Sequence, residues 1–369
     1  MTSIVKYAKR LRHRLLSESP CVIRAISRPS TALCTLSMYI GFLLSEPRSP
    51  SCCRLAEVMA VSHDSVNRFL ERERYTPVDL FAEVKAGLNL KGGTLSVDDS
   101  VLDKPYSQYM ALVGFYWSGK HHRVVKGINL ITLYYTDLQG HHQPVNYRLY
   151  DKAEGKTKND YFQEMLTEVL AWGLEPSWVT GDSWYSGVNN LKLIRHHELG
   201  FLFALESNRL VSVAKGTWTQ VQHLEIPAHG LTVWLRQFGQ VKVFRTWLKD
   251  QPRHYAVYLP DPAQLAAFDR SAFTLRHDQH WQIEQYHRVL KQVCHIEHFR
   301  VRHPRAIRNH IFAALCGYVQ LQQMRVTNMI SSCYHLQRHL FDDIIASFIQ
   351  SFMASKDFPQ PQFRAAVNA

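Results

Sequence analysis

Short apolar runs alternate with amphipathic stretches through the middle of the chain, and their lengths separate strands from helices. The first runs are rich in β-branched and aromatic residues and are separated by turns that contain glycine, which is typical of strands. The predicted order is strands at 94–101, 108–119 and 127–137, an extended edge at 142–151, a helix at 158–174, a strand at 177–182, a helix at 187–200 and a strand at 201–207. An antiparallel start followed by βαβ units predicts a mixed α/β sheet flanked by helices.

The pattern changes after residue 207. Three alternating segments at 231–239, 240–249 and 253–260 predict a small antiparallel sheet. A helix follows at Trp281–Gln292, the chain stays helical to about Phe352, and 356–369 is expected to be a loose tail. We therefore expect a core made of 91–207 and 263–330, a β-rich insertion at 208–262, and a helical C-terminal tail at 331–369.

Residues 1–90 are predicted to be helical, and 55–73 within them has the layout of a helix-turn-helix. The apolar positions are Leu55, Val58 and Met59 in the first helix and Val66, Phe69 and Leu70 in the second, with Ser62 as N-cap between them. The second helix would present His63, Asp64, Asn67 and Arg68 outward. A plain helical hairpin has the same pattern, so 1–90 is a hypothetical DNA-binding region at this point.

The charge of the chain narrows the class of partner. Lys and Arg number 43 against 31 Asp and Glu, a formal net charge of +12. This excess favours a polyanion, nucleic acid before an anionic membrane, although good solubility alone also explains it. The apolar run at 31–44 is too short to span a bilayer and is expected to be a buried helix. Seven Cys without a CxxC pair exclude a zinc ribbon and indicate reduced thiols in a cytoplasm.

Three acidic positions stand out on this scheme. Asp98 or Asp99 ends the first strand, Asp182 ends the strand at 177–182, and Glu284 lies at the border of the apolar stripe of the late helix. Acids at strand ends of an open α/β sheet lie where ligands bind. Taken singly, each acid is more often a turn cap or half of a surface ion pair.

Converging carboxylates need a compensating charge, because their mutual repulsion otherwise raises a pKa or separates them. Hard oxygen ligands suit Mg²⁺ or Mn²⁺, and a pair of such ions activates a nucleophile and stabilises the leaving oxygen of a phosphodiester. Arg288 and Lys291, which follow Glu284 on the same flank of the helix, would bind the adjacent phosphates. A two-carboxylate glycosidase explains the acids but not the basic charge or the N-terminal helices.

The segments "VDDSVLDK", "VTGDSWYSG" and "WQIEQYHRVLKQ" resemble the three acidic motifs of the DDE transposases of bacterial insertion sequences. The branch with a β-rich insertion before the catalytic Glu carries a Tyr-x2-Arg-x3-Glu-x6-Lys signature. Glu284 and Lys291 keep its second half, whereas His277 and His280 replace the Tyr and the Arg. The resemblance covers about Gly93 to Arg325 and implies a ribonuclease H-like fold.

The resemblance also implies an activity. Asp99 or Asp98, Asp182 and Glu284 would hold two Mg²⁺ ions, with Mn²⁺ able to substitute, for hydrolysis at transposon ends and strand transfer by the freed 3′-OH. The strand alternation leaves both aspartates open, with Asp99 preferred. The implied DNA contacts are Lys291, Arg288, His287, His280 and Lys104, together with Asn67, Arg68 and His63 of the helix-turn-helix.

The expected partners are the terminal inverted repeats and target DNA, bound by a homodimer in the bacterial cytoplasm at the nucleoid, with no membrane and no small-molecule cofactor. The alternative is a catalytically inactive DNA-binding relative that acts through its helix-turn-helix.

Overall fold

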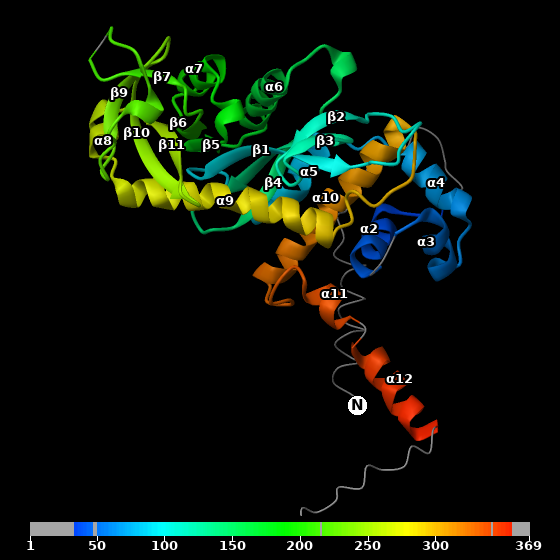
Figure 1. Ribbon diagram of the computed structural model, residues 1–369. Helices are drawn as coiled ribbons and strands as arrows, with labels where there is room; N and C mark the ends of the chain where they lie inside the picture. The colour runs from blue at the N-terminus through cyan, green and yellow to red at the C-terminus, as the bar shows by residue number, and fades with distance from the viewer. Residues whose placement is uncertain (1–32, 47–49, 215, 341, 356–369) are drawn as a thin grey trace, which may run out of the picture.

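The computed structural model describes residues 33–46, 50–214, 216–340 and 342–355, with no side-chain description for 352–355. Figure 1 shows a broad sheet with helices on both sides and a smaller helical group at one end. The predicted tail at 356–369 and the first 32 residues lie outside the described residues.

Strand β1 (Thr94–Asp103) lies at the centre of the core sheet. On one side it pairs antiparallel with β3 (Arg123–Thr136), which in turn pairs with β2 (Gly114–Ser118) and β4 (His142–Leu149). On the other side β1 pairs parallel with β5 (Trp178–Gly181), and β5 pairs parallel with β6 (Gly200–Leu205). The order β4-β3-β1-β5-β6, antiparallel at one end and parallel at the other, confirms the predicted ribonuclease H-like mixed sheet.

The chain between β6 and the late helix forms five more strands. They are β7 (Leu210–Ser212), β8 (Thr219–Gln220), β9 (Leu231–Leu235), β10 (Gly239–Leu248) and β11 (Gln251–Tyr258). They pair antiparallel, as the alternation predicts, but they do not form a separate sheet. Strand β11 pairs antiparallel with β6, so the insertion extends the core into one sheet of 11 strands.

Helices cover both faces of the sheet. Figure 1 shows α6 (Lys158–Ala171) and α7 (Val188–His196) on one side and α9 (Arg270–Gln292) along the other, below β1 and β5. Helices α8 (Pro262–Ala267), α10 (Pro304–Val326), α11 (His335–His339) and α12 (Asp342–Ser355) complete the second half, and α12 points away from the rest of the molecule. None of the helices among the described residues is long and apolar enough to cross a membrane.

Helix α9 is longer than its sequence pattern predicts and is joined to β1 at two places. It begins eleven residues before Trp281, where the Asp269 side chain accepts from the Ala272 N–H. Thr94 Oγ1 at the start of β1 donates to Gln279 Oε1 at 2.7 Å, and Lys291 Nζ donates to the Val101 carbonyl at 2.6 Å. The helix therefore runs alongside β1, with Glu284 between the two contacts.

The N-terminal helices pack at the far end of the core. They are α2 (Leu36–Ser45), α3 (Cys52–Met59), α4 (His63–Arg72) and α5 (Pro77–Val84). Ser62 caps α4 as predicted, since its side chain accepts from the Ser65 N–H. Asn309 of α10 donates to the Leu70 and Glu73 carbonyls at 2.6 and 2.7 Å, which fixes the end of α4 on the core.

One part of the predicted α3–α4 pair is wrong. Leu55 is buried as expected, but Val58 and Met59 are 47% and 39% exposed. Helix α3 ends at Met59, and Ala60 follows in the left-handed conformation with a φ of 53°. The turn comes so early that only the first part of α3 packs on α4, and the last apolar residues face solvent.

Candidate active site

The register between β1 and β5 brings two of the predicted acids together. In this parallel pair Val97 lies opposite Gly181, and the next residues are Asp98 and Asp182. Because neighbouring strands lie about 4.8 Å apart, the two carboxylates leave the sheet at the same level. Asp98 and Asp99 are consecutive in β1 and point to opposite faces, so only one of them can face α9.

Asp98 is the aspartate that faces α9. Its Oδ2 lies 3.5 Å from Nδ1 of His287, and its Oδ1 accepts from the Asp99 N–H at 2.7 Å. Burial acts to raise the pKa of Asp98, but His287 and the charge of His280 outweigh it, and the net pKa lies below its usual value. Glu284 is one helical turn before His287 on the same side of α9, which directs it toward Asp98.

Asp99 is enclosed by partners from three elements. Asn129 Nδ2 on β3 and Lys158 Nζ on α6 donate to its Oδ2 at 2.6 and 2.8 Å. The Tyr185 hydroxyl donates to its Oδ1 at 3.1 Å. Both carboxylate oxygens thus have protein donors, and Asp99 links β1, β3, α6 and the turn after β5.

Within the described part of the chain, Asp182 forms no ion pair with a cationic side chain. Its Oδ1 accepts from the backbone N–H groups of Trp184 and Tyr185 at 3.0 and 3.4 Å, capping the short turn Ser183–Tyr185. Burial above all, and then the charges of Asp98 and Asp99, raise the pKa of Asp182 to about 7, although the two N–H bonds lower it. At neutral pH this carboxyl is therefore close to half protonated.

Glu284 lies exposed on α9. Partial burial of its carboxyl and then the charge of Asp98 raise its pKa, while His287 and Arg288 lower it. Asp98 thus influences both Asp182 and Glu284, and the three acids form one electrostatic group.

This group has the donors for a hard divalent cation. Within the described residues, no set of three or more His, Cys, Asp or Glu side chains is arranged to hold a metal ion. The donor chemistry nevertheless fits: burial first, and then the negative charge of Asp98, raise the pKa of both Asp182 and Glu284, and a divalent cation would neutralise that shared charge. Asp98, Asp182 and Glu284 would supply the negative charge and the oxygen ligands that such a cation needs.

The histidines expected to contact phosphate lie instead against the acids. His287 is 8% exposed, and its Nε2 is buried without a hydrogen-bond partner among the described residues. His280 Nδ1 lies 3.2 Å from Thr180 Oγ1, and burial lowers the pKa of His280 to about 4 although Asp98 raises it. His287 is buried against Asp98, and His280, which is half-buried, acts on Asp98 through its charge.

The structure also corrects the expectation for Lys104. Its side chain is buried, its Nζ donates to the Phe299 carbonyl at 3.0 Å, and burial lowers its pKa to about 8. Lys291 is held by Val101 and lies 3.8 Å from Glu297 Oε2. Arg288 is exposed, one turn beyond Glu284.

The predicted contacts in α4 remain on the surface to different extents. His63 and Arg68 are exposed, Asn67 is half-buried, and Arg68 Nε donates to the Asp64 carbonyl at 3.3 Å. They lie on a helix of the N-terminal group and not on the sheet that carries the acids.

Asn129, Lys158 and Tyr185 are site residues that sequence reasoning missed. Tyr185 follows Asp182 by three residues, so its place in that motif was a usable signal. Asn129 and Lys158 lie in a strand and a helix whose patterns predict only the element. The role of Asn129 depends on the β1–β3 register, in which it pairs with Val101, and that of Lys158 on its place at the start of α6.

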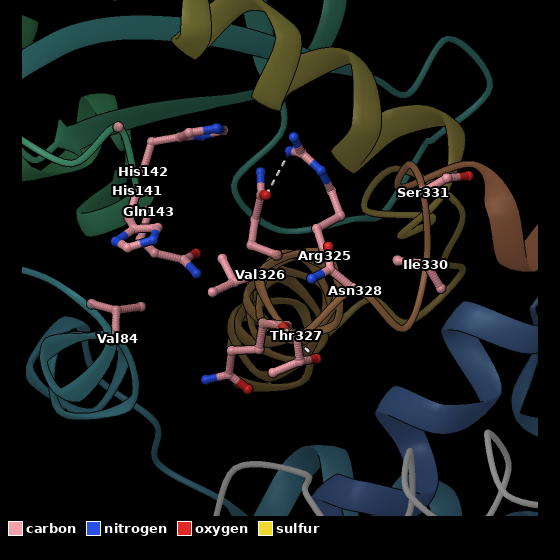
Figure 2. Close-up of a pocket in the computed structure, with 14 residues that line it drawn as sticks. Val84, His141, His142, Gln143, Arg325, Val326, Thr327, Asn328, Ile330 and Ser331 are labelled. Atoms are coloured by element: carbon pink, nitrogen blue, oxygen red, sulfur yellow. Dashed lines mark hydrogen bonds between the residues drawn. The ribbon is translucent and has the colours of Figure 1, made fainter.

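A cavity of about 460 Å³ lies elsewhere, where β4 begins and α5 and α10 end. Figure 2 shows His141, His142 and Gln143 on one side of it and Arg325 to Asn328 on the other. Burial and then the charge of Arg325 lower the pKa of His142, which is about 4. No acid of the site described above lines this cavity.

The profile of a protein family described as "Transposase DDE domain" matches residues 91–320. The chain belongs to this family. The match confirms the resemblance drawn from the three acidic motifs, and it covers all of them. The chain is thus a DDE transposase, from a family whose chemistry is nucleolytic and transesterifying and which generally uses divalent metal ions.

Two solved transposase structures are similar to this one at low identity. One is a piggyBac transposase synaptic complex with hairpin DNA, at 12% identity and a TM-score of 0.49, covering 97% of this chain and 83% of that chain. The other is a Drosophila P element transposase strand transfer complex, at 10% identity and a TM-score of 0.28, covering 58% of this chain and 53% of that chain. The assignment of this DDE transposase to its family depends on neither. Among curated proteins, none matches its sequence significantly.

Proposed function

We propose that this DDE transposase cleaves DNA at the ends of a bacterial insertion sequence and joins the freed 3′ ends to target DNA. The observation that carries the proposal is the β1–β5 register, which places Asp98 and Asp182 at one level of the sheet beside the α9 face that bears Glu284. Such a group of carboxylates beside a basic helix suits a polyanionic substrate held through metal ions.

Within this proposal Asp98, and not Asp99, is the metal ligand of β1. Asp99 already accepts from Asn129, Lys158 and Tyr185, whereas Asp98 faces the helix with Glu284. Asp98, Asp182 and Glu284 would hold Mg²⁺ or Mn²⁺, which when bound activates the attacking hydroxyl and stabilises the leaving oxygen. His287 orients Asp98, and Asp99 fixes the middle of β1 on α6 through Lys158.

The N-terminal helices give the proposal a DNA-binding region. The α3–α4 pair presents His63 and Arg68 to solvent, and the net charge of +12 favours DNA. We assign terminal-repeat binding to residues 1–90, catalysis to 91–207 and 263–330, and assembly as a homodimer on DNA to the whole chain. The strands at 208–262, joined to β6, would enlarge the surface beside Glu284.

The test is metal-dependent cleavage of the inverted repeats that flank the gene. Purified full-length protein with Mg²⁺ or Mn²⁺ should nick these ends, and Asp98→Asn, Asp182→Asn and Glu284→Gln should each abolish nicking while keeping the repeats bound. Unchanged nicking by Asp182→Asn would refute the proposal. Repeat binding without any nicking by the wild type would favour the inactive DNA-binding relative.

A further inference from the structure

The cavity beside α10 has polar side chains of only two kinds, basic and neutral. Its lining includes two histidines, one arginine and six side chains that end in an amide or a hydroxyl, and none of the described residues that line it is acidic. The six neutral residues are Gln143, Gln322, Gln323, Thr327, Asn328 and Ser331. Amides and hydroxyls pair with the hydroxyl groups of a ligand, and a guanidinium pairs with an anion. The volume of about 460 Å³ is that of a small-molecule site.

Gln143 is the residue that points to a ligand. It is 8% exposed, and its Oε1 is buried with no hydrogen-bond partner among the described residues. Figure 2 shows its side chain directed from β4 into the cavity. A buried amide oxygen without a partner costs free energy, so a native protein completes it with bound water, an ion or a ligand. The Gln143 amide therefore needs a hydrogen-bond donor inside the cavity.

A buried chain of hydrogen bonds determines what His142 offers to the same space. Gln322 Nε2 donates to the Tyr318 hydroxyl. The Tyr318 and Tyr134 hydroxyls lie 2.6 Å apart, and the Tyr134 hydroxyl contacts His142 Nδ1. Because Tyr318 accepts from Gln322, its own proton goes to Tyr134, and the Tyr134 proton goes to His142 Nδ1. Burial above all, and then the charge of Arg325, lower the pKa of His142 to about 4, so the ring is neutral near pH 7 and carries its hydrogen on Nε2.

Arg325 brings the positive charge to the cavity. The residue is exposed, and its Nη1 donates to Gln322 Oε1 at 2.8 Å, which is a neutral acceptor. Its charge is close enough to act on the pKa of His142, so one ligand can contact both side chains. A guanidinium and an imidazole N–H together suit the charged oxygens of a phosphomonoester.

We propose that this cavity binds a sugar phosphate, with the phosphate between Arg325 and His142 and a sugar hydroxyl donating to Gln143 Oε1. The other amide and hydroxyl side chains of the lining would hold the remaining sugar hydroxyls. The site shares no residue with the acid site and needs no assumption about cleavage. A free sugar phosphate and the phosphorylated end of a nucleic acid strand both have this chemistry.

The first experiment measures binding of ribose 5-phosphate to the full chain by titration calorimetry, with ribose and inorganic phosphate as the two fragments. Ribose 5-phosphate should bind at least about tenfold more tightly than either fragment, because only the whole molecule contacts both Arg325 and Gln143. Arg325→Gln should weaken its binding about 10- to 150-fold through loss of a charge-assisted contact. Equal binding of inorganic phosphate and ribose 5-phosphate would mean an adventitious ion only. That result, or no binding at millimolar ribose 5-phosphate, would overturn the proposal.

The second experiment separates a ligand contact from a structural role. Gln143→Met removes the unpartnered amide and keeps a side chain of similar length. It should raise the melting temperature of the free protein and weaken ribose 5-phosphate binding about 2- to 10-fold. Gln320→Met is the matched control, because Gln320 Oε1 is also buried without a partner among the described residues, but Gln320 does not line the cavity. The control should melt higher and bind as the wild type does. Unchanged binding by Gln143→Met would mean that water alone completes Gln143, and the proposal would fail.

Competition identifies the source of the sugar phosphate. A repeat-end duplex with a 5′-phosphate, and the same duplex with a 5′-hydroxyl, are each added to the protein with ribose 5-phosphate bound. If neither releases ribose 5-phosphate, the ligand is a free small molecule. If only the phosphorylated duplex releases it, the ligand is the end of a DNA strand. Release by both duplexes would make the cavity part of a general DNA-binding surface, and a sugar phosphate site would be wrong.

Discussion

The acid site is built from carboxylates, whereas no carboxylate of the described residues lines the cavity beside α10. At the acid site Asp98, Asp182 and Glu284 form one electrostatic group, and Glu284 is exposed. Asp182 follows the end of β5, but Asp98 lies within β1, which continues to Asp103, and not at its end as predicted. The cavity offers about 460 Å³ lined by histidine and amide side chains and Arg325, without a carboxylate. For a polymer substrate a surface that the strand can lie across is more useful than a hollow, so size alone is a poor guide to the site here.

The largest expected difference between the two regions is in cleavage. Asp182→Asn should lower metal-dependent cleavage at least about 10³-fold, because it removes a charged ligand worth several kcal/mol in the transition state. The measurement is the single-turnover rate on a repeat-end duplex, with repeat binding as the check on folding. A loss of less than about tenfold would mean that the carboxylate of Asp182 is not needed for the chemistry.

The next comparison is between the two aspartates of β1. Asp98→Asn should abolish cleavage and leave stability nearly unchanged. Asp99→Asn leaves the half-buried Lys158 without its carboxylate and should cost about 1–3 kcal/mol in the free energy of unfolding. The measurements are urea unfolding and the cleavage rate of both variants, which show which aspartate serves the chemistry and which serves stability. The reverse result, with Asp99→Asn inactive and Asp98→Asn unstable, would exchange their roles.

The acid site should also make the free energy of unfolding depend on pH, through Asp182. The pKa of Asp182 is about 7 in the folded chain, against 3.8 for an unperturbed aspartate. Between these values the folded state holds a proton that the unfolded chain has lost, so the free energy of unfolding falls as pH rises from about 4 to 7 and is flat above. Asp182→Asn should lack this part of the slope and melt higher than the wild type at pH 8.

Added Mg²⁺ should act where that carboxyl is ionised. It should raise the melting temperature of the wild type more at pH 8 than at pH 5, and have little effect on Asp182→Asn. Scanning fluorimetry with Mg²⁺ and with matched ionic strength from NaCl gives the comparison. An equal rise in both proteins would place the ion elsewhere.

The smallest effect is expected at the cavity. Arg325 is exposed and donates to Gln322 Oε1 at 2.8 Å. Arg325→Gln should change stability by about 0.5 kcal/mol or less and leave cleavage within about threefold. A larger loss of cleavage would show that the cavity takes part in DNA binding and would remove the contrast between the regions.

The sequence predicts the central sheet well, because strand alternation and turn residues are local signals. It cannot choose between Asp98 and Asp99, since alternation says only that they face opposite ways and not which face α9 covers. The joining of β11 to β6 is also invisible, because backbone hydrogen bonds between strands depend little on side-chain identity. Lys104 and Val58 have ordinary surface and core side chains, and only tertiary packing reverses their places.

Thr94 with Gln279 and Val101 with Lys291 attach α9 to β1 on either side of Glu284. The position of the Glu284 carboxylate relative to β1 therefore depends on these two hydrogen bonds and not on the path the chain takes between β7 and β9. Segments of different length or composition can occupy that path without altering the geometry at the sheet edge. The length of that segment can therefore change while the third acid stays where it is.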